Sequence, residues 1–250
     1  MSGHGMQKRV GALVVGLLSC VAATAAAQPA DESRFSIDVG FGFDVSVNGN
    51  INSGAIGRVD GQAAAILPNA YGDVYGTGLH LRFGAGYSLD DASELRGVFT
   101  FQSADADLVR LGDIGPSSLY AQYSDYQTLG LDFGYRRYIP LRDSRVRPYA
   151  EASLGIAFID AIDVVLAAPQ ADVVFDNTDF FDQTAAFTWG IGAGVLFPVA
   201  DRVDLNVQAG FRRVSGLAEV DQLIGTGLDD INNDSARFTF PVVVGARIRF

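Results

Sequence analysis

The segment FSIDVGFGFDVSV, residues 35–47, alternates strictly between two kinds of side chain. Seven apolar residues occupy the odd positions, and Ser, Asp and Gly occupy the even ones. This period of two is typical of a β-strand with an apolar face and a polar face. A strand of a soluble protein rarely keeps this period for so long. The segment therefore raises the question of what covers its apolar face.

Seven later segments repeat the pattern, which gives eight strands in all. Most of them place large apolar residues opposite glycine and charged or polar residues. Gly97 and Val98 blur the alternation in the third strand. The seven segments are LHLRFGAGYSL (79–89), ELRGVFTFQ (94–102), TLGLDFGYRRY (128–138), PYAEASLGIAF (148–158), FTWGIGAGVLF (187–197), VDLNVQAGFRR (203–213) and VVVGARIRF (242–250).

Eight long strands with a wide apolar face indicate a barrel in a membrane. Each segment has the roughly 9 to 11 residues that a tilted strand needs to cross a bilayer. In such a barrel the apolar face meets lipid and the polar face lines the interior. The alternative is an exported β-sandwich with one buried face, a class that does not need eight strands of this length. We predict an all-β, antiparallel, up-and-down transmembrane barrel.

The connections between the strands also fit this topology. They are long at about residues 48–74, 103–125, 159–184 and 214–236, and short elsewhere. Short turns belong to the periplasmic side of such barrels and long loops to the outside. Aromatic residues near the strand ends on the periplasmic side predict a girdle at headgroup depth. They are Phe35, Tyr87, Tyr135, Tyr138, Phe197 and Phe250.

Two proline-containing stretches lead to more local expectations. Pro241 falls inside the last strand and lacks an N–H, so regular pairing is expected to begin after it or to bulge there. In the third loop, IDVVLAAPQADVVF (residues 162–175) offers two apolar pieces, each about half the length needed to cross lipid. We expect an external hairpin that turns at Pro169 and Gln170.

The N-terminal residues predict export. Lys8 and Arg9 precede an apolar run over residues 10–18, and an Ala-rich stretch follows, which fits a signal peptide (1–27) cleaved after Ala27. Residues 28–34 then form a short periplasmic segment, and residues 35–250 form the barrel. A rival interpretation takes LLSC as a lipoprotein site acylated at Cys20. Cleavage after Ala27 leaves a mature chain without cysteine, hence without disulfides.

The charge balance argues against nucleic acid as a partner. The chain carries 18 Lys and Arg against 29 Asp and Glu, for a net charge of −11. Removing residues 1–27 takes away two cations and no acid, so the mature charge is −13. A strongly acidic surface repels the phosphate backbone.

In its strand pattern the chain resembles the small eight-stranded outer-membrane barrels of Gram-negative bacteria, the group that includes the OmpA transmembrane domain, OmpX and OmpW. The resemblance covers residues 35–250 and rests on the strand pattern, on YGTGLHLRFGAGY and RPYAEASLGIAF, and on the terminal Phe250. It implies a place in the outer membrane and recognition of Phe250 by the barrel-assembly machinery. A monomer is favoured. The group includes adhesins, resistance factors, narrow channels and lipid-modifying enzymes, so the fold does not choose a function.

The polar face predicts a network of charges inside the barrel. Eleven acids and arginines fall on inward positions of the strands. Opposite charges in a narrow interior are expected to pair, because an unpaired buried charge costs several kcal/mol. The alternatives are a lumen plugged by salt bridges and a gated, narrow pore in which some pairs exchange. The residues are Asp38, Asp44, Arg82, Arg96, Asp132, Arg136, Glu151, Asp204, Arg212, Arg247 and Arg249.

Catalysis and metal binding have weaker support. His80 is the one histidine left after the signal, it points inward, and no serine can be assigned beside it, so we predict no enzyme and no cofactor.

The third and fourth loops hold many acids and no Arg or Lys. These carboxylates either form a solvated rim or bind divalent cations that bridge to lipopolysaccharide phosphates. The candidate contacts are Asp176, Asp179, Asp182, Asp229, Asp230 and Asp234.

Together these observations predict an outer-membrane barrel whose partners are outer-membrane lipid and lipopolysaccharide. It would act in envelope integrity or surface interaction through its acidic external loops. The alternative is a narrow channel for small solutes or ions.

Overall fold

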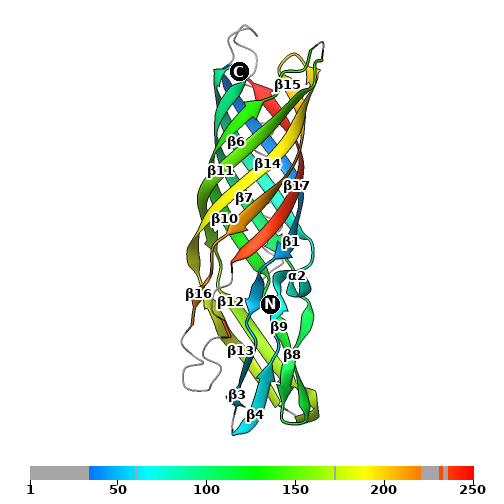
Figure 1. The fold of residues 1–250 in the computed structure, drawn as a ribbon, viewed down its shortest axis with the longest axis vertical. Helices are drawn as coiled ribbons and strands as arrows, with labels where there is room; N and C mark the ends of the chain where they lie inside the picture. Colours follow the sequence, from blue (N-terminus) through cyan, green and yellow to red (C-terminus); the bar gives the residue numbers. More distant parts are fainter. Residues whose placement is uncertain (1–33, 60, 143, 172, 221–230, 233–235) are drawn as a thin grey trace.

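The computed structural model describes residues 34–59, 61–142, 144–171, 173–220, 231–232 and 236–250. These residues form a closed barrel of eight antiparallel strands, with the order β1, β17, β15, β14, β11, β10, β7, β6 around the wall (Figure 1). The strands are β1 (Phe35–Asn48), β6 (Gly78–Asp90), β7 (Ser93–Ala104), β10 (Tyr126–Tyr138), β11 (Arg147–Ile159), β14 (Thr184–Ala200), β15 (Val203–Val214) and β17 (Arg237–Arg249). The eight-stranded barrel is confirmed.

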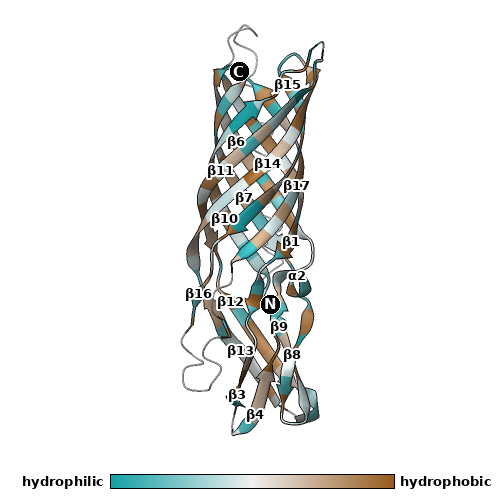
Figure 2. Cartoon of the chain, in the orientation of Figure 1, coloured by the Kyte–Doolittle hydropathy of each residue, from teal (hydrophilic) through white to brown (hydrophobic). Residues whose placement is uncertain are grey.

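The barrel wall is apolar outside and polar inside. On β1 the side chains of Phe41 and Phe43 are 64% and 65% exposed, whereas Asp38 and Asp44 are buried. Polar and apolar residues are interleaved along every barrel strand (Figure 2). Because side chains alternate between the two faces of a strand, this wall presents lipid with an apolar belt and encloses a polar lumen. Within the described residues, no helix has the length and apolarity to span a bilayer.

Two local expectations are wrong. Tyr138 does not join an aromatic girdle: it is 5% exposed and lies inside the barrel, because it shares the inward face of β10 with Arg136. Pairing along β17 also does not begin after Pro241, and no bulge forms there. Pro241 pairs with Asp44 of β1, whereas the ladder to β15 lacks the pairs of Gly210 with Pro241 and of Phe211 with Phe240 and then resumes in the same register. The missing N–H is thus accommodated by a local gap.

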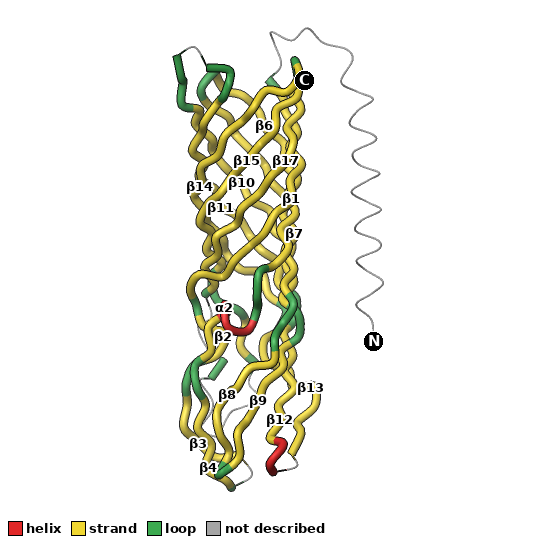
Figure 3. The backbone as a smooth tube through the Cα atoms, turned by 90° about the vertical axis from the view of Figure 1, so that its right-hand side faces the viewer, coloured by secondary structure: helices red, strands yellow, loops and turns green. Residues whose placement is uncertain are grey.

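The long loops build a second structure, here called the extension, at one end of the barrel (Figure 3). Its main element is a seven-stranded sheet in the order β16, β13, β12, β9, β8, β4, β3. The strands are β3 (Ala55–Val59), β4 (Gln62–Ile66), β8 (Leu108–Ile114), β9 (Ser117–Tyr123), β12 (Ile162–Ala168), β13 (Val173–Asp182) and β16 (Ala218–Glu219). The expected hairpin in the third loop is confirmed as β12 and β13, joined by the 3₁₀ turn η2 (Pro169–Ala171).

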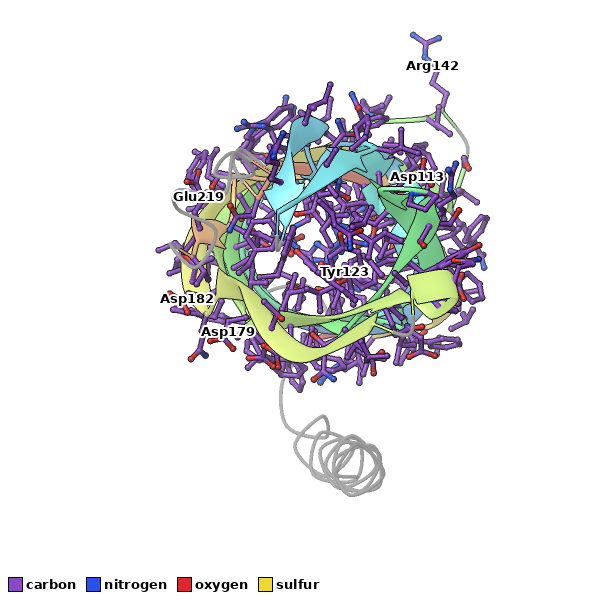
Figure 4. All side chains as sticks on the ribbon, turned by 90° about the horizontal axis from the view of Figure 1, so that it is seen from below. Asp113, Tyr123, Arg142, Asp179, Asp182 and Glu219 are labelled. Carbon is purple, nitrogen blue, oxygen red and sulfur yellow. The ribbon has the colours of Figure 1, made fainter. Side chains whose placement is uncertain are left out.

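The extension has its own apolar core. The short helix α2 (Tyr71–Val74) and strand β2 (Asn50–Asn52), which pairs with β5 (Asn69–Ala70), contribute residues to this core, and the core continues onto the ends of barrel strands at Ile159 and Val214. Buried residues from every loop meet there, among them Tyr75 and Tyr123, and Figure 4 shows Tyr123 pointing into the interior. Burial raises the pKa of both tyrosines well above the ordinary value. The long loops are therefore packed together as one unit.

Candidate functional site

All eleven charged residues expected in the lumen point to the barrel interior. Nine are buried, while Arg82 and Arg249 are partly buried. Ion pairs connect ten of them, and Asp44 instead accepts a hydrogen bond from Gln102 at 2.6 Å. Near the end of the barrel that carries the short turns, Asp204 pairs with Arg249 at 3.3 Å.

Glu151 is the centre of the network. Its carboxylate forms ion pairs with Arg82 at 2.5 Å, Arg96 at 2.6 Å and Arg136 at 2.8 Å. The cross-strand register explains one contact, because Glu151 of β11 is the direct partner of Arg136 on β10. Arg96 also reaches Asp38 at 2.8 Å. Three guanidinium groups thus share two carboxylates across the barrel, a dense arrangement that fixes all five side chains.

Glu94 is a member of the network that the sequence analysis missed. It is fully buried, pairs with Arg247 at 2.7 Å and accepts hydrogen bonds from the hydroxyls of Ser36, at 3.0 Å, and Tyr138. The blurred phase of the third strand concealed it. Its spacing was nonetheless informative, because Glu94 lies two residues before Arg96 and so shares its face of β7.

A second layer of polar contacts lies closer to the extension. Arg212 pairs with Asp132 at 3.2 Å, and Asp132 also accepts a hydrogen bond from Thr188 at 2.6 Å. The ring nitrogen Nδ1 of His80 lies 3.1 Å from the amide nitrogen of Gln102. The amide nitrogen of Gln102 can only donate, so this contact uses Nδ1 as the acceptor. His80 is therefore a hydrogen-bonded lumen residue in the structure.

Arg237 closes the lumen toward the extension. It is 1% exposed, donates to Ser46 at 2.9 Å, and its guanidinium lies 4.1 Å from the ring centre of Tyr126 and 5.8 Å from that of Tyr71. A cation over aromatic faces is a favourable contact once both are desolvated. Sequence reasoning missed Arg237 because it precedes Pro241, before the point where the last strand was expected to begin.

Little free volume remains between these side chains. A cavity of about 60 Å³ is lined by residues that include His80, Thr100, Asp132, Ser153 and Gln208. Since one water molecule needs roughly 10–15 Å³ measured in this way, the cavity has room for a few waters. The side chains of the described residues therefore fill most of the lumen, as expected for a barrel of this size.

The acidic loop residues are only partly described. Asp179 and Asp182 lie exposed on β13, and Glu219 of β16 pairs with Phe181, the residue before Asp182. These residues lie along one side of the extension in Figure 4. The described residues contain no group of three or more metal-binding side chains. The side chain of Asp176 and residues 229, 230 and 234 lie outside the described part, so cation binding stays a prediction.

The predicted processing sites also lie outside the described residues. Residues 1–33 include Cys20 and Ala27. Export with cleavage after Ala27, and the rival acylation of Cys20, both remain predictions, as does the boundary between the segment 28–34 and the barrel.

Comparison with known proteins now identifies the family. Residues 13–249 match the family described as "Outer membrane protein beta-barrel domain", and the chain belongs to it. Its location is therefore the outer membrane of Gram-negative bacteria. No curated protein matches the sequence significantly.

Several solved structures are similar in fold. The chain is 15% identical to Neisserial surface protein A over 87% of its own length and 98% of that chain, with a TM-score of 0.43. It is 12% identical to OprG from Pseudomonas aeruginosa, over 89% and 99% of the two chains, with a TM-score of 0.43. The outer membrane enzyme PagL is 12% identical over 85% and 99%, with a TM-score of 0.35. At this level of similarity no function carries over.

Proposed function

We propose that this outer-membrane protein is a closed barrel that acts through its extension, in surface interaction or envelope integrity, without catalysis. The observation that carries the proposal is the division of the molecule into two packed parts. The lumen is occupied by buried ion pairs centred on Glu151, and the described parts of the long loops pack around an apolar core. A barrel that is filled inside and structured outside is suited to present a surface.

The chemistry of that surface favours lipopolysaccharide as a partner. The end with short turns is assigned to the periplasm, so the extension faces the outside. Asp182 and Glu219 lie on adjacent strands there, with exposed acids on one side of the extension. Carboxylates bind hard divalent cations, which also bind phosphate. Divalent cations would therefore join the acidic side of the extension to phosphates of the outer leaflet.

The test is the binding of fluorescent lipopolysaccharide to the protein in nanodiscs, with and without millimolar Mg²⁺. We expect binding that requires Mg²⁺ and falls several-fold in the double variant Asp182→Asn, Glu219→Gln. The matched control is Asp90→Asn, Asp91→Asn, which removes two exposed acids from a short turn and leaves binding unchanged. Equal binding by the loop variant and the wild type would contradict the proposal.

The absence of catalysis is tested on the one histidine of the mature chain. A catalytic base must be accessible to its lipid substrate. His80 is 3% exposed and hydrogen-bonded to Gln102, so a lipid cannot reach it. Mass spectrometry of lipid A from cells that express the wild type or His80→Ala should give identical spectra. A modification of lipid A that the variant loses would show that the protein is an enzyme.

A narrow channel is the second candidate. Glycines of β14 and β15 line the small lumen cavity, namely Gly190, Gly192 and Gly210, and they leave room for water. An exchange of ion-pair partners around that cavity would open a path for small solutes. Conductance distinguishes this candidate from the closed barrel.

A further inference from the structure

The lipid-facing wall of the barrel contains a groove of about 610 Å³. Residues of β10, β11, β14, β15 and β17 line it, on the outside of the barrel. Its walls include three aromatic residues, Tyr135, Phe211 and Phe240. The rings of Phe211 and Phe240 meet edge to face with their centres 5.9 Å apart. The groove thus has aromatic side chains on its walls.

The floor of the groove is a row of small side chains set by the register of the sheet. Ala150 of β11 pairs with Ala193 of β14, and Ala193 pairs with Ala209 of β15. On the other side Ala150 pairs with Arg137 of β10. Since neighbouring strands lie about 4.8 Å apart, the row runs about 14 Å from Arg137 to Ala209. It thus begins at a cation and continues over methyl groups alone.

This row also changes depth in the membrane. Arg137 is the residue before the last of β10, at the end of the barrel with the short turns, whereas Ala209 lies in the middle of β15. The tilt of the strands therefore carries the row from the periplasmic boundary toward the centre of the bilayer. A phospholipid of the periplasmic leaflet has the same arrangement, with its phosphate at the boundary and its chains toward the centre.

The cation at the boundary is available to a headgroup. The side chain of Arg137 is 56% exposed, and its ion pair with Asp90, which is itself 59% exposed, has a separation of 4.0 Å. Exposed pairs of this kind contribute little energy. A guanidinium group can bind two oxygens of a phosphate at once.

We propose that this groove is a binding site for one phospholipid of the periplasmic leaflet. The phosphate lies on Arg137, and one acyl chain lies over Ala150, Ala193 and Ala209 between the aromatic walls. The charge of Arg137 complements the phosphate, and the alanine floor lets the chain approach the sheet more closely than bulk lipid does. The inference depends on the membrane location and not on the function proposed for the extension.

The experiment counts the phospholipids that stay with the protein. The mature chain is reconstituted in phosphatidylethanolamine with phosphatidylglycerol and extracted in mild detergent. Native mass spectrometry then measures the mass of the protein with its bound lipid. Ala193→Phe fills the groove, and its control Ala85→Phe adds the same ring to a lipid-facing alanine of β6 outside the groove. Arg137→Gln removes the cation, and its control is Arg142→Gln in a short turn, where Arg142 points away from the barrel (Figure 4). Heat-dependent gel mobility verifies that each variant is folded.

We expect one retained phospholipid in the wild type and in both controls. Ala193→Phe should retain none, and Arg137→Gln should show about fivefold lower occupancy, as one cation near a membrane surface implies. Equal retention by Ala193→Phe and Ala85→Phe would overturn the proposal, as would a wild type without bound phospholipid. A dimer that Ala193→Phe dissociates would also overturn it, because a second copy would then cover the groove.

Discussion

Replacing Glu151 by glutamine removes the carboxylate that three arginines share. The substitution keeps the shape of the side chain and deletes one negative charge. Arg82, Arg96 and Arg136 would then face Asp38, which lies 2.8 Å from Arg96 and 3.9 Å from Arg136, and Glu94, which lies 3.9 Å from Arg96 and is already paired with Arg247. Two surplus positive charges would remain in a space that gives little access to water.

The size of the effect follows from the burial of the network. Deleting one partner of a buried ion pair costs about 3–5 kcal/mol of folding free energy, since the other charge stays buried without compensation. Glu151 serves three partners within 2.8 Å, so we expect the upper part of this range. Adding Arg82→Gln to Glu151→Gln removes one of the surplus charges and should restore about 0.5–3 kcal/mol through coupling between the sites.

Equilibrium unfolding in urea from lipid vesicles measures these free energies. Fluorescence of Trp189, the one tryptophan of the chain, reports the transition. Asp90→Asn is the control, because the exposed pair of Asp90 with Arg137 should leave the midpoint unchanged. An unchanged midpoint for Glu151→Gln would refute the conclusion that the lumen is held by buried ion pairs.

Three further predictions concern other parts of the molecule. Tyr138→Phe removes a hydroxyl bonded to Glu94 and should cost about 1–3 kcal/mol in the same titration, whereas Tyr135→Phe on the lipid-facing side should cost nothing measurable. Burial raises the pKa of Tyr75 and Tyr123, so these tyrosines ionise at lower pH in the unfolded chain than in the folded one. Their burial therefore stabilises the extension fully below about pH 10, and this stabilisation is lost as the pH rises further. Absorbance and circular dichroism should show that tyrosine ionisation accompanies unfolding of the extension. Calorimetry with millimolar Ca²⁺ or Mg²⁺ should detect binding to the acidic loops. If no heat of binding is measured, the prediction of cation contacts is wrong.

The barrel was predictable from sequence because one physical constraint governs each strand. The face of the barrel that contacts lipid must be apolar, and because side chains alternate along a strand, every second residue must be apolar. The inward position of Arg96, Asp132 and Glu151 follows from the same period. Tyr138 was misplaced because its aromatic character was given more weight than its position, although it lies two residues from Arg136 on the inward face.

The extension was less predictable, because no bilayer imposes a period on its strands. Only the hairpin around Pro169 carried enough apolar residues to stand out. Strands β3 and β4 form one short hairpin and strands β8 and β9 form another. These hairpins join the sheet by pairing with segments far away in the chain, β4 with β8 and β9 with β12. The pairing partners within the lumen were equally hidden, since which arginine reaches Glu151 depends on shear and rotamers that a single strand does not encode.

Single-channel conductance of refolded residues 28–250 in a planar bilayer tests the central claim most directly. A heat-dependent gel shift establishes beforehand that the barrel has folded. We predict a folded and silent barrel, because the arginines around Glu151 and the Arg237 contact with Tyr126 fill the lumen. Reproducible current steps would contradict the closed barrel and would establish the narrow channel in its place.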